Sequence, residues 1–314
     1  MPLPLVSVNV PCYRQLTLAV RAIDSIRAQT YTNLEITLLD DGASDDYREH
    51  VRSLGDPRVR YHRNEERLGA MKNMFAAISA GSGEFTMAFH EDDLLSAGYL
   101  AAAAGILQSN ASCGFVVCQL NEFTQEPGPS SLNRDVPYPA YEKFATSTEF
   151  VRGVLRGTVD PMFGSVVYRR AALEGVIPDH DRYATLVDRP FLLSIVERGW
   201  TAAVIREPMV WNRQHLRDGD TRHMAMTSDH ILELLDTYRS KLPGRPTKEE
   251  RALFFSYSGY WLFELYRLTP TDQRPAVWKF LFDAWRKGVY DPRARGRFGL
   301  RQIQRALLNQ TSCF

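Results

Sequence analysis

The chain has 314 residues, of which 44% are hydrophobic, and its 38 Lys and Arg residues nearly balance its 37 Asp and Glu residues. This composition is typical of a globular protein with one large domain or two smaller ones, and the near-neutral balance argues against a nucleic-acid-binding protein, which is usually distinctly basic. Because no run of about 18 apolar residues appears and Met1-Pro2-Leu3-Pro4 does not begin a signal peptide, we expect a cytoplasmic protein.

The first hundred residues alternate between strand-like and helix-like patterns. The β-branched run at 5–10, closed by Pro11, predicts a buried strand, and apolar residues at helical spacing from Leu16 predict a helix that ends near Gln29. Further strands are predicted at 34–39, 59–62 and 85–89, with a helix at 70–80. This alternation predicts βαβ units with right-handed crossovers, and hence an α/β fold with a largely parallel sheet.

Acidic residues follow two of these strands. Residues 40–46, Asp-Asp-Gly-Ala-Ser-Asp-Asp, predict a turn whose last residues, Asp45 and Asp46, can cap the next helix. The strand at 85–89 stops at His90-Glu91-Asp92-Asp93, where three carboxylates are adjacent. Ionised carboxylates this close repel one another, and Mg²⁺ or Mn²⁺ would neutralise them at the edge where open α/β sheets bind ligands. The alternative is a solvated acidic turn.

Six short motifs follow one another in the first hundred residues. They are Val6–Tyr13, Ala28–Ile36, Asp40–Asp46, Asp56–Tyr61, Leu68–Asn73 and Glu91–Asp93. In this order and spacing they resemble glycosyltransferase family 2, and the resemblance returns between Gly164 and His215. It implies a GT-A fold, which is a Rossmann-like α/β/α sandwich with a mostly parallel sheet. It also implies transfer of a sugar, with inversion, from a nucleotide-sugar that is bound at the carboxyl edge of the sheet.

The resemblance assigns the donor contacts. Pro11, Tyr13, Asp40 and Asp41 match the positions that contact the nucleotide base and ribose, and a carboxylate and an aromatic ring can accept from and stack on a uracil. Lys72 stands where the family usually has Arg, and it can meet a phosphate as a point charge. The alternatives are that the acidic residues only build a turn and that Lys72 is a solvated helix residue.

The resemblance also implies a metal site that departs from the family pattern. Family members usually have Asp-x-Asp-Asp, so His90 replaces the first Asp and Glu91 is the variable position. Asp93 is expected to coordinate Mn²⁺ or Mg²⁺, and Asp92 to contact the ribose or the water shell of the metal. The cation would neutralise charge on the leaving diphosphate. For His90, a contact with the ribose or diphosphate and a structural role both stay open.

The second hundred residues have a different character. A helix is predicted at 100–108 and strands at 114–118 and 163–170, and the resemblance brings Gly164 close to the donor sugar. Residues 124–145 are rich in Pro, Gly and Ser, a composition that does not favour regular structure. We therefore predict a surface loop over the site that helps to select the acceptor.

The catalytic base is assigned to Asp188, which opens an apolar-periodic helix. The family commonly has Glu-Asp at this place, and Val187 replaces the Glu. The alternative for Asp188 is a helix N-cap. After a strand predicted at 201–205, the segment 211–215 resembles the aromatic-Arg-x-His motif of the family. Its His215 can reach the metal or the diphosphate, and a structural role is the alternative.

The C-terminal residues, 225–314, are predicted to be helical. Aromatic residues at 278–285 are surrounded by nine Lys and Arg residues and two Asp residues in the basic-aromatic segment, which we define as 274–305. This segment fits an amphipathic helix on an anionic membrane, packing on the catalytic domain, or an oligomer contact, with packing preferred. We divide the chain into a GT-A catalytic domain at 1–222, with a nucleotide-sugar half at 1–100 and an acceptor half at 101–222, and a helical region at 223–314.

The predicted function is therefore that of an inverting, metal-dependent glycosyltransferase. The expected donor is a nucleoside-diphosphate sugar, in particular a UDP-sugar, and the acceptor is a glycan, a lipid-linked sugar or a small molecule. Membrane contact would place the protein at the inner face of the membrane. A nucleotide-sugar-binding or scaffolding protein of weak activity is the alternative, because His90 and Val187 replace acidic residues of the family. Cys12, Cys113, Cys118 and Cys313 show neither metal-site nor disulfide spacing and are interpreted as reduced thiols.

Overall fold

The computed structural model describes residues 2–42, 44–133, 139–160, 162–214, 226–268 and 277–289. The chain groups into two compact units. The first, here called the sheet unit, comprises Met1–Thr146, Thr158–Val176 and Ser194–Asp218. The second, the helical unit, comprises Ser147–Gly157, Ile177–Leu193 and Gly219–Phe314. The helical unit therefore contains two segments from the middle of the sequence as well as the C-terminal region.

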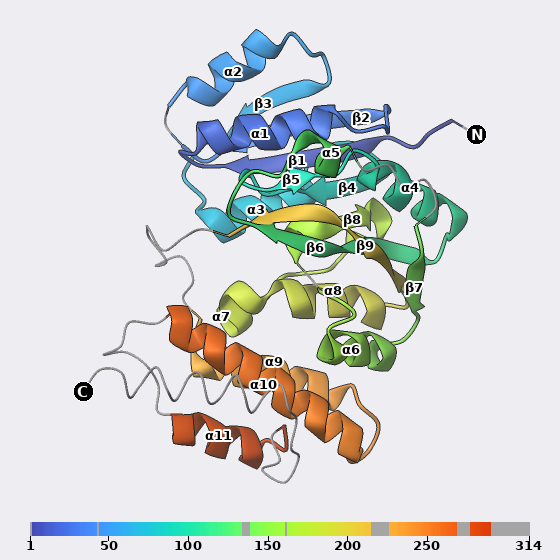
Figure 1. Cartoon of the computed structure of the whole chain (residues 1–314), viewed down its shortest axis with the longest axis vertical. Coiled ribbons are helices and arrows are strands. Elements are labelled where there is room, and N and C mark those ends of the chain that lie inside the picture. Colours follow the sequence, from blue (N-terminus) through green and yellow to red (C-terminus); the bar gives the residue numbers. More distant parts are fainter. Residues whose placement is uncertain are drawn as a thin grey trace. The chain divides into compact units, whose positions relative to one another are not determined.

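The sheet unit is built on a mixed sheet with nine strands among the described residues (Figure 1). In spatial order the strands are β3 (Val59–Arg63), β2 (Leu34–Asp40), β1 (Val6–Cys12), β4 (Phe85–Ala88), β8 (Val166–Arg169), β6 (Cys113–Phe123), β9 (Thr201–Arg213) and β5 (Leu94–Leu95). The remaining strand, β7 (Tyr141–Phe144), also pairs with β9. The α/β fold class predicted from the sequence is confirmed.

The first four strands of this order run parallel, as the sequence pattern predicts. β1 lies between β2 and β4, and every residue at 6–10 is buried, including the polar Ser7 and Asn9 that alternate with its valines. The prediction that Pro11 ends this strand is wrong, because β1 continues to Cys12. Pairing with β4 stops at Asn9, so Pro11, which has no N–H, lies where β1 pairs only with β2.

The second half of the sheet is mixed. β8 is antiparallel to β4 and β6, and β5 and β7 are antiparallel to β9. The strand predicted at 201–205 is much longer, because β9 pairs with β6 along its whole length. The register between β9 and β6 shifts near Pro208. A bulge at this point accommodates the residues that interrupt the apolar pattern of β9. The strand predicted at 163–170 begins with a 3₁₀ turn, η1 (Phe163–Ser165).

Helices connect the strands of the sheet unit and cover its faces (Figure 1). They are α1 (Leu16–Arg27), α2 (Asp46–Leu54), α3 (Ala70–Ser79), α4 (Tyr99–Ser109), α5 (Pro129–Leu132) and the 3₁₀ helix η2 (Arg170–Leu173). The prediction that 124–145 lacks regular structure is wrong, since α5 and β7 lie within it. Pro129 is compatible with the first turn of a helix, and the following strand obtains its hydrogen bonds from β9.

The helical unit contains α6 (Ser147–Arg156), α7 (His180–Tyr183), η3 (Ala184–Leu186), α9 (Ser228–Ser240), α10 (Lys248–Leu268) and α11 (Val277–Arg286). It also contains the start of α8 (Asp188–Glu197). α9 contacts α7, α10 and α11, and α10 contacts α6. The prediction of helices after residue 225 is confirmed for the described residues, whereas the domain boundary at 222 stays a proposal.

Two further observations concern the chain as a whole. The described cysteines, Cys12, Cys113 and Cys118, are buried free thiols, and Cys313 lies outside the described residues. Among the helices that the structure describes, none combines the length and apolar character needed to cross a membrane.

Candidate active site

The carboxyl ends of β1, β2 and β4 meet at one edge of the sheet. Cys12 is in register with Asp40, and Asn9 with Ala88. Because these strands are parallel, Tyr13, the 40–46 turn and the segment from His90 to Asp93 all begin at the same edge. This is the place where the sequence pattern predicted a ligand site.

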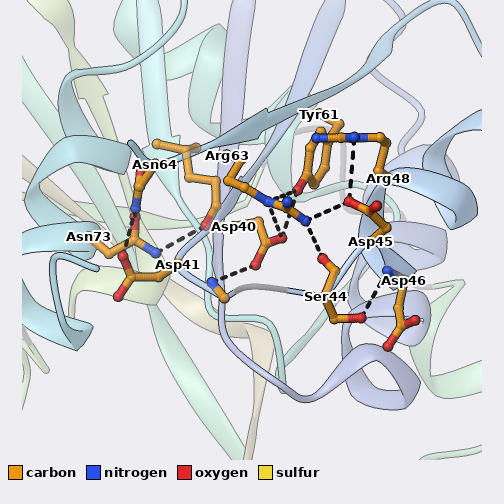
Figure 2. A network of polar contacts seen from close by, with 12 residues as sticks. Asp40, Asp41, Ser44, Asp45, Asp46, Arg48, Tyr61, Arg63, Asn64 and Asn73 are labelled. Atoms are coloured by element: carbon orange, nitrogen blue, oxygen red, sulfur yellow. Dashed lines mark hydrogen bonds and ion pairs between the residues drawn. The ribbon is translucent and has the colours of Figure 1, made fainter. Parts of the chain in front are cut away.

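Asp40 is buried and holds the turn after β2 to the end of β3 (Figure 2). Its Oδ1 accepts from the backbone N–H of Gly42 at 2.8 Å, and its Oδ2 accepts from the Tyr61 hydroxyl at 2.8 Å. The Arg63 guanidinium lies 3.8 Å from Oδ2. The tyrosine and the arginine, which are not among the predicted site residues, thus fix the position of this carboxylate.

The expected helix cap at Asp45 and Asp46 takes a different form. α2 begins at Asp46, whose N–H donates to the Ser44 hydroxyl at 3.2 Å, and Asp45 makes no side-chain cap bond. The Asp45 carboxylate instead pairs with Arg63 at 2.8 Å and Arg48 at 3.4 Å (Figure 2). Two guanidinium groups compete with the backbone N–H groups for this carboxylate.

Asp41 organises the loop that leads to α3. Its carboxylate accepts from the Asn64 side chain at 2.9 Å and from the backbone N–H groups of Leu68 and Gly69 at 2.7 and 2.8 Å. Gly69 has φ +80°, a conformation that side chains rarely adopt. Asn73 is buried and joins this network through Asn64 (Figure 2), whereas Lys72 is exposed in the first turn of α3.

Glu91, a variable position in the family pattern, connects three elements. Its carboxylate accepts from the backbone N–H of Tyr13 at 2.9 Å and from the Tyr47 hydroxyl of α2 at 2.7 Å. Burial raises the pKa of Glu91 to about 7, despite these two donors. The centre of the Tyr13 ring lies 5.0 Å from the guanidinium of Arg14 and 4.5 Å from that of Arg67. Two cationic groups thus adjoin the proposed base-binding ring.

The structure brings His90, Asp92 and Asp93 together. Ligand atoms of these three residues lie within 4.8 Å of one another. Asp93 is fully buried, and its Oδ1 accepts from the backbone N–H of Arg213 at 2.9 Å and from the Asn212 side chain at 3.2 Å. An imidazole nitrogen and two carboxylates are suited to a divalent cation.

His90 has a defined orientation in this cluster. Its Nδ1 lies 3.0 Å from Oδ2 of Asp93, so a proton on Nδ1 would be donated to the carboxylate and the lone pair would be on Nε2. Gly164 lies against the ring, because a Cβ at this position would be 2.9 Å from Nδ1. The glycine that resemblance assigned to the donor sugar therefore also leaves room for this histidine.

The end of β9 supplies residues that the sequence did not identify. Besides holding Asp93, Arg213 donates through Nε to the Asp92 carbonyl at 3.0 Å, and its guanidinium pairs with Glu126. The sequence signal for Asn212 and Arg213 is the Trp-Asn-Arg segment of the predicted family motif that ends at His215. His215 itself lies outside the described residues.

Asp188 belongs to the helical unit, and its contacts with Arg189 lie within that unit. It is the first residue of α8, as predicted, and is 7% exposed. Its Oδ1 accepts from the backbone N–H and guanidinium of Arg189 at 2.8 and 2.6 Å. The same guanidinium lies 4.5 Å from the centre of the Trp261 ring on α10. A side chain of the C-terminal helices thus supports the residue that holds this carboxylate.

The fold and the sheet edge define an α/β protein of the GT-A type, with clustered carboxylates suited to a divalent cation. The family model described as "Glycosyl transferase family 2" matches residues 7–176, which is more than half of the chain. The chain therefore belongs to glycosyl transferase family 2.

Similar proteins agree with this assignment. The GalNAc(5)-diNAcBac-PP-undecaprenol beta-1,3-glucosyltransferase of Campylobacter jejuni is 35% identical over 116 residues, which is 36% of this chain and 36% of that protein. The chain spans half or less of the length of the first curated relatives it matches.

Solved structures are similar in fold. TarS 1-349 of S. aureus, in complex with UDP-GlcNAc, has a TM-score of 0.55 and 14% identity, covering 97% of this chain and 92% of that one. A mannosyltransferase of Pyrobaculum calidifontis, in complex with GDP-Man and Mn²⁺, has a TM-score of 0.55 and 18% identity, covering 99% and 88%.

Proposed function

We propose that the protein is an inverting glycosyltransferase that moves a sugar from a UDP-sugar to an acceptor hydroxyl and depends on a divalent cation. The observation that carries this proposal is the cluster of His90, Asp92 and Asp93 at the same sheet edge as Asp40. A nucleoside diphosphate needs both a cation partner for its phosphates and polar contacts for its base and ribose, and this edge offers both.

In the proposed donor site, Tyr13 and Pro11 contact the base and Asp40 accepts from it. Asp41 keeps the 64–69 loop in place, which brings Lys72 of α3 to the phosphate side. Asp92 contacts the ribose or the water shell of the metal, and Gly164 allows the sugar to approach closely. The complexes of TarS with UDP-GlcNAc and of the Pyrobaculum mannosyltransferase with GDP-Man support a nucleotide-sugar in this fold.

Asp93 and His90 would hold the cation, Mn²⁺ or Mg²⁺, and His215 is proposed as a further contact. When bound, the cation stabilises negative charge on the departing diphosphate. The backbone of Arg213 and the side chain of Asn212 keep the Asp93 carboxylate in position. Mn²⁺ in the Pyrobaculum complex supports a divalent metal in this fold.

Asp188 is proposed as the general base. It would accept the proton of the acceptor hydroxyl as that oxygen attacks the anomeric carbon and the bond to the diphosphate breaks. Arg189, bonded to Asp188 Oδ1 through its backbone and guanidinium, would orient the carboxylate. The direct displacement gives inversion and needs no covalent sugar intermediate.

The acceptor is proposed to be a lipid-linked sugar. The relative from Campylobacter jejuni is named for an undecaprenol-linked acceptor, which supports this choice over a free glycan or a small molecule. A cytoplasmic location at the inner face of the membrane also stays a proposal.

The test measures UDP binding and UDP release from a panel of UDP-sugars, with and without Mn²⁺. For Asp188→Asn we expect sugar transfer to fall by about 10²- to 10⁴-fold while donor affinity and melting temperature stay near wild type, because Asn cannot accept the proton. For Asp93→Asn we expect loss of the metal-dependent part of UDP binding. Asp181→Asn, an exposed carboxylate of α7, is the control and should change neither quantity.

Each outcome decides one part of the proposal. Near-normal turnover in Asp188→Asn would reject the base, and unchanged metal-dependent UDP affinity in Asp93→Asn would reject the ligand. A wild-type protein that binds UDP but releases none from any UDP-sugar, with or without acceptor, would favour the binding or scaffolding alternative.

A further inference from the structure

Helix α11 has two apolar faces with different environments. Phe280 and Ala284 are buried, and α11 contacts α9. In contrast, Trp278, Phe282 and Trp285 are 73%, 49% and 55% exposed. Their spacing of four and three residues places them on one side of the helix, and the last two rings are 6.0 Å apart. We call these three residues the aromatic stripe.

The aromatic stripe is a sizeable apolar surface. An aromatic side chain presents roughly 150–250 Å², so three that are about half exposed or more give a patch on the order of 300 Å². Patches of this size on soluble proteins often mark interaction sites, whereas a stable contact between two protein copies needs about 800 Å² on each. The area therefore favours a partner other than a second copy.

Positive charge accompanies the stripe. Exposed basic side chains of α11 and the residues after it are Lys279, Arg286 and Lys287. Lys287 lies 3.8 Å from Glu233 and 3.6 Å from Asp236, both on α9. The basic-aromatic segment has nine basic and two acidic residues, although the net charge of the whole chain is only +1. Among the described residues, the exposed Lys279 and Arg286 directly follow Trp278 and Trp285 of the stripe, and their positive charge complements an anionic surface.

We propose that the aromatic stripe docks the protein on an anionic lipid bilayer. Trp and Phe are suited to the boundary between head groups and acyl chains, and neighbouring Lys and Arg are attracted to anionic lipids. α11 has 10 residues, or about 15 Å, so it would lie along the surface and not cross it. Its buried face packs on α9 within the helical unit, so the proposed docking concerns only the exposed face.

The inference rests on the proposed function in one respect, because a lipid-linked acceptor is found at a membrane. Docking is nevertheless separable from catalysis. Vesicles that contain neither donor nor acceptor report only docking, whereas UDP release from a UDP-sugar without vesicles reports only the chemistry. Failure of one leaves the other standing.

The experiment is co-sedimentation of the full chain with vesicles of phosphatidylcholine, with and without 30% phosphatidylglycerol. We expect binding to the anionic vesicles alone, and at least tenfold weaker binding at 0.5 M than at 0.05 M salt, because salt screens the basic residues. The triple variant Trp278→Ser, Phe282→Ser, Trp285→Ser should bind at least tenfold more weakly at low salt. Its melting temperature should stay near wild type, because the replaced side chains are exposed.

A matched control is Ile177→Ser, because Ile177 is 83% exposed elsewhere in the helical unit. It should bind vesicles like wild type. Absence of wild-type binding to anionic vesicles would overturn the proposal, as would equal binding by the wild type and the triple variant. Self-association that the triple variant abolishes, without vesicle binding, would assign the stripe to a second copy and also overturn it.

Discussion

At the scale of single residues, the contact between Gly164 and His90 gives a direct test of the candidate metal site. A Cβ at position 164 would be 2.9, 3.1 and 3.2 Å from three atoms of the imidazole ring. In Gly164→Ala the ring must therefore shift, which would disturb its 3.0 Å contact with Asp93. We expect Mn²⁺ affinity, measured by calorimetry with UDP present, to fall about tenfold, as for other residues that orient metal ligands.

Gly105→Ala is the control for this variant. Gly105 lies within α4 and a Cβ there would meet nothing within 4 Å. We expect a stabilisation of roughly 0.5–1 kcal/mol from higher helix propensity and an unchanged Mn²⁺ affinity. Wild-type Mn²⁺ affinity in Gly164→Ala would show that the orientation of His90 does not matter for the metal.

Glu91 shows a limit of single-residue reasoning from the sequence. By comparison with the family pattern it was a variable position between two assigned residues. In the structure it accepts from Tyr13 and Tyr47, which are 78 and 44 residues away along the chain. Contacts over such separations are set by the packing of β1, β4 and α2, and the local sequence contains no signal for them.

At the scale of elements, Asp56 links α1 to β3. Its carboxylate accepts from Arg58 at 2.8 and 3.1 Å and from Arg27 of α1 at 3.0 Å. Hydrogen bonds from Arg58, with a further contribution from Arg27, hold the pKa of Asp56 well below its usual range. We expect Asp56→Asn to reduce the free energy of unfolding by about 1–2 kcal/mol at pH 7, because both arginines are partly exposed and solvent screens them.

The pH dependence has a definite sign. A carboxylate with a depressed pKa in the folded state stabilises the fold above its unfolded pKa of about 3.9, and this stabilisation declines as the pH falls toward the folded value. Urea unfolding should therefore show a smaller difference between Asp56→Asn and wild type at pH 3 than at pH 7. Asp24→Asn is the control, since Asp24 also pairs with Arg27 but its side chain is 55% exposed. A difference independent of pH would contradict the ionic origin.

At the scale of the whole molecule, Glu250 joins the middle of the chain to its C-terminal helices. It accepts from Arg152 of α6 at 2.8 and 3.0 Å and forms a capping box with Thr247 at the start of α10. Glu250 is 5% exposed. We expect Glu250→Ala to destabilise the protein by about 2–3 kcal/mol, because it removes a cap and leaves a guanidinium with fewer partners.

The neighbouring Glu249 is the matched control. Glu249 pairs with Arg156, which also lies on α6, but the side chains of Glu249 and Arg156 are 69% and 49% exposed. Glu249→Ala should therefore reduce the free energy of unfolding by less than about 0.5 kcal/mol. Hydrogen exchange should show α6 and α10 losing protection together in Glu250→Ala. Loss of protection in α10 alone would mean that α6 does not depend on this contact.

The sequence by itself determined the alternation of strands and helices up to β4, the family, and the helical character of the C-terminal region, because these depend on local periodicity and short motifs. It also identified the edge that carries Asp40 and Asp93, since parallel strands present their carboxyl ends together.

Only the tertiary structure decided that β9 passes a bulge near Pro208 and brings Asn212 and Arg213 to Asp93. It likewise placed α6 with the last helices and left one face of α11 exposed. Asp93 and Arg213 are 120 residues apart, and the free energy that joins such residues comes from the pairing and burial of whole elements.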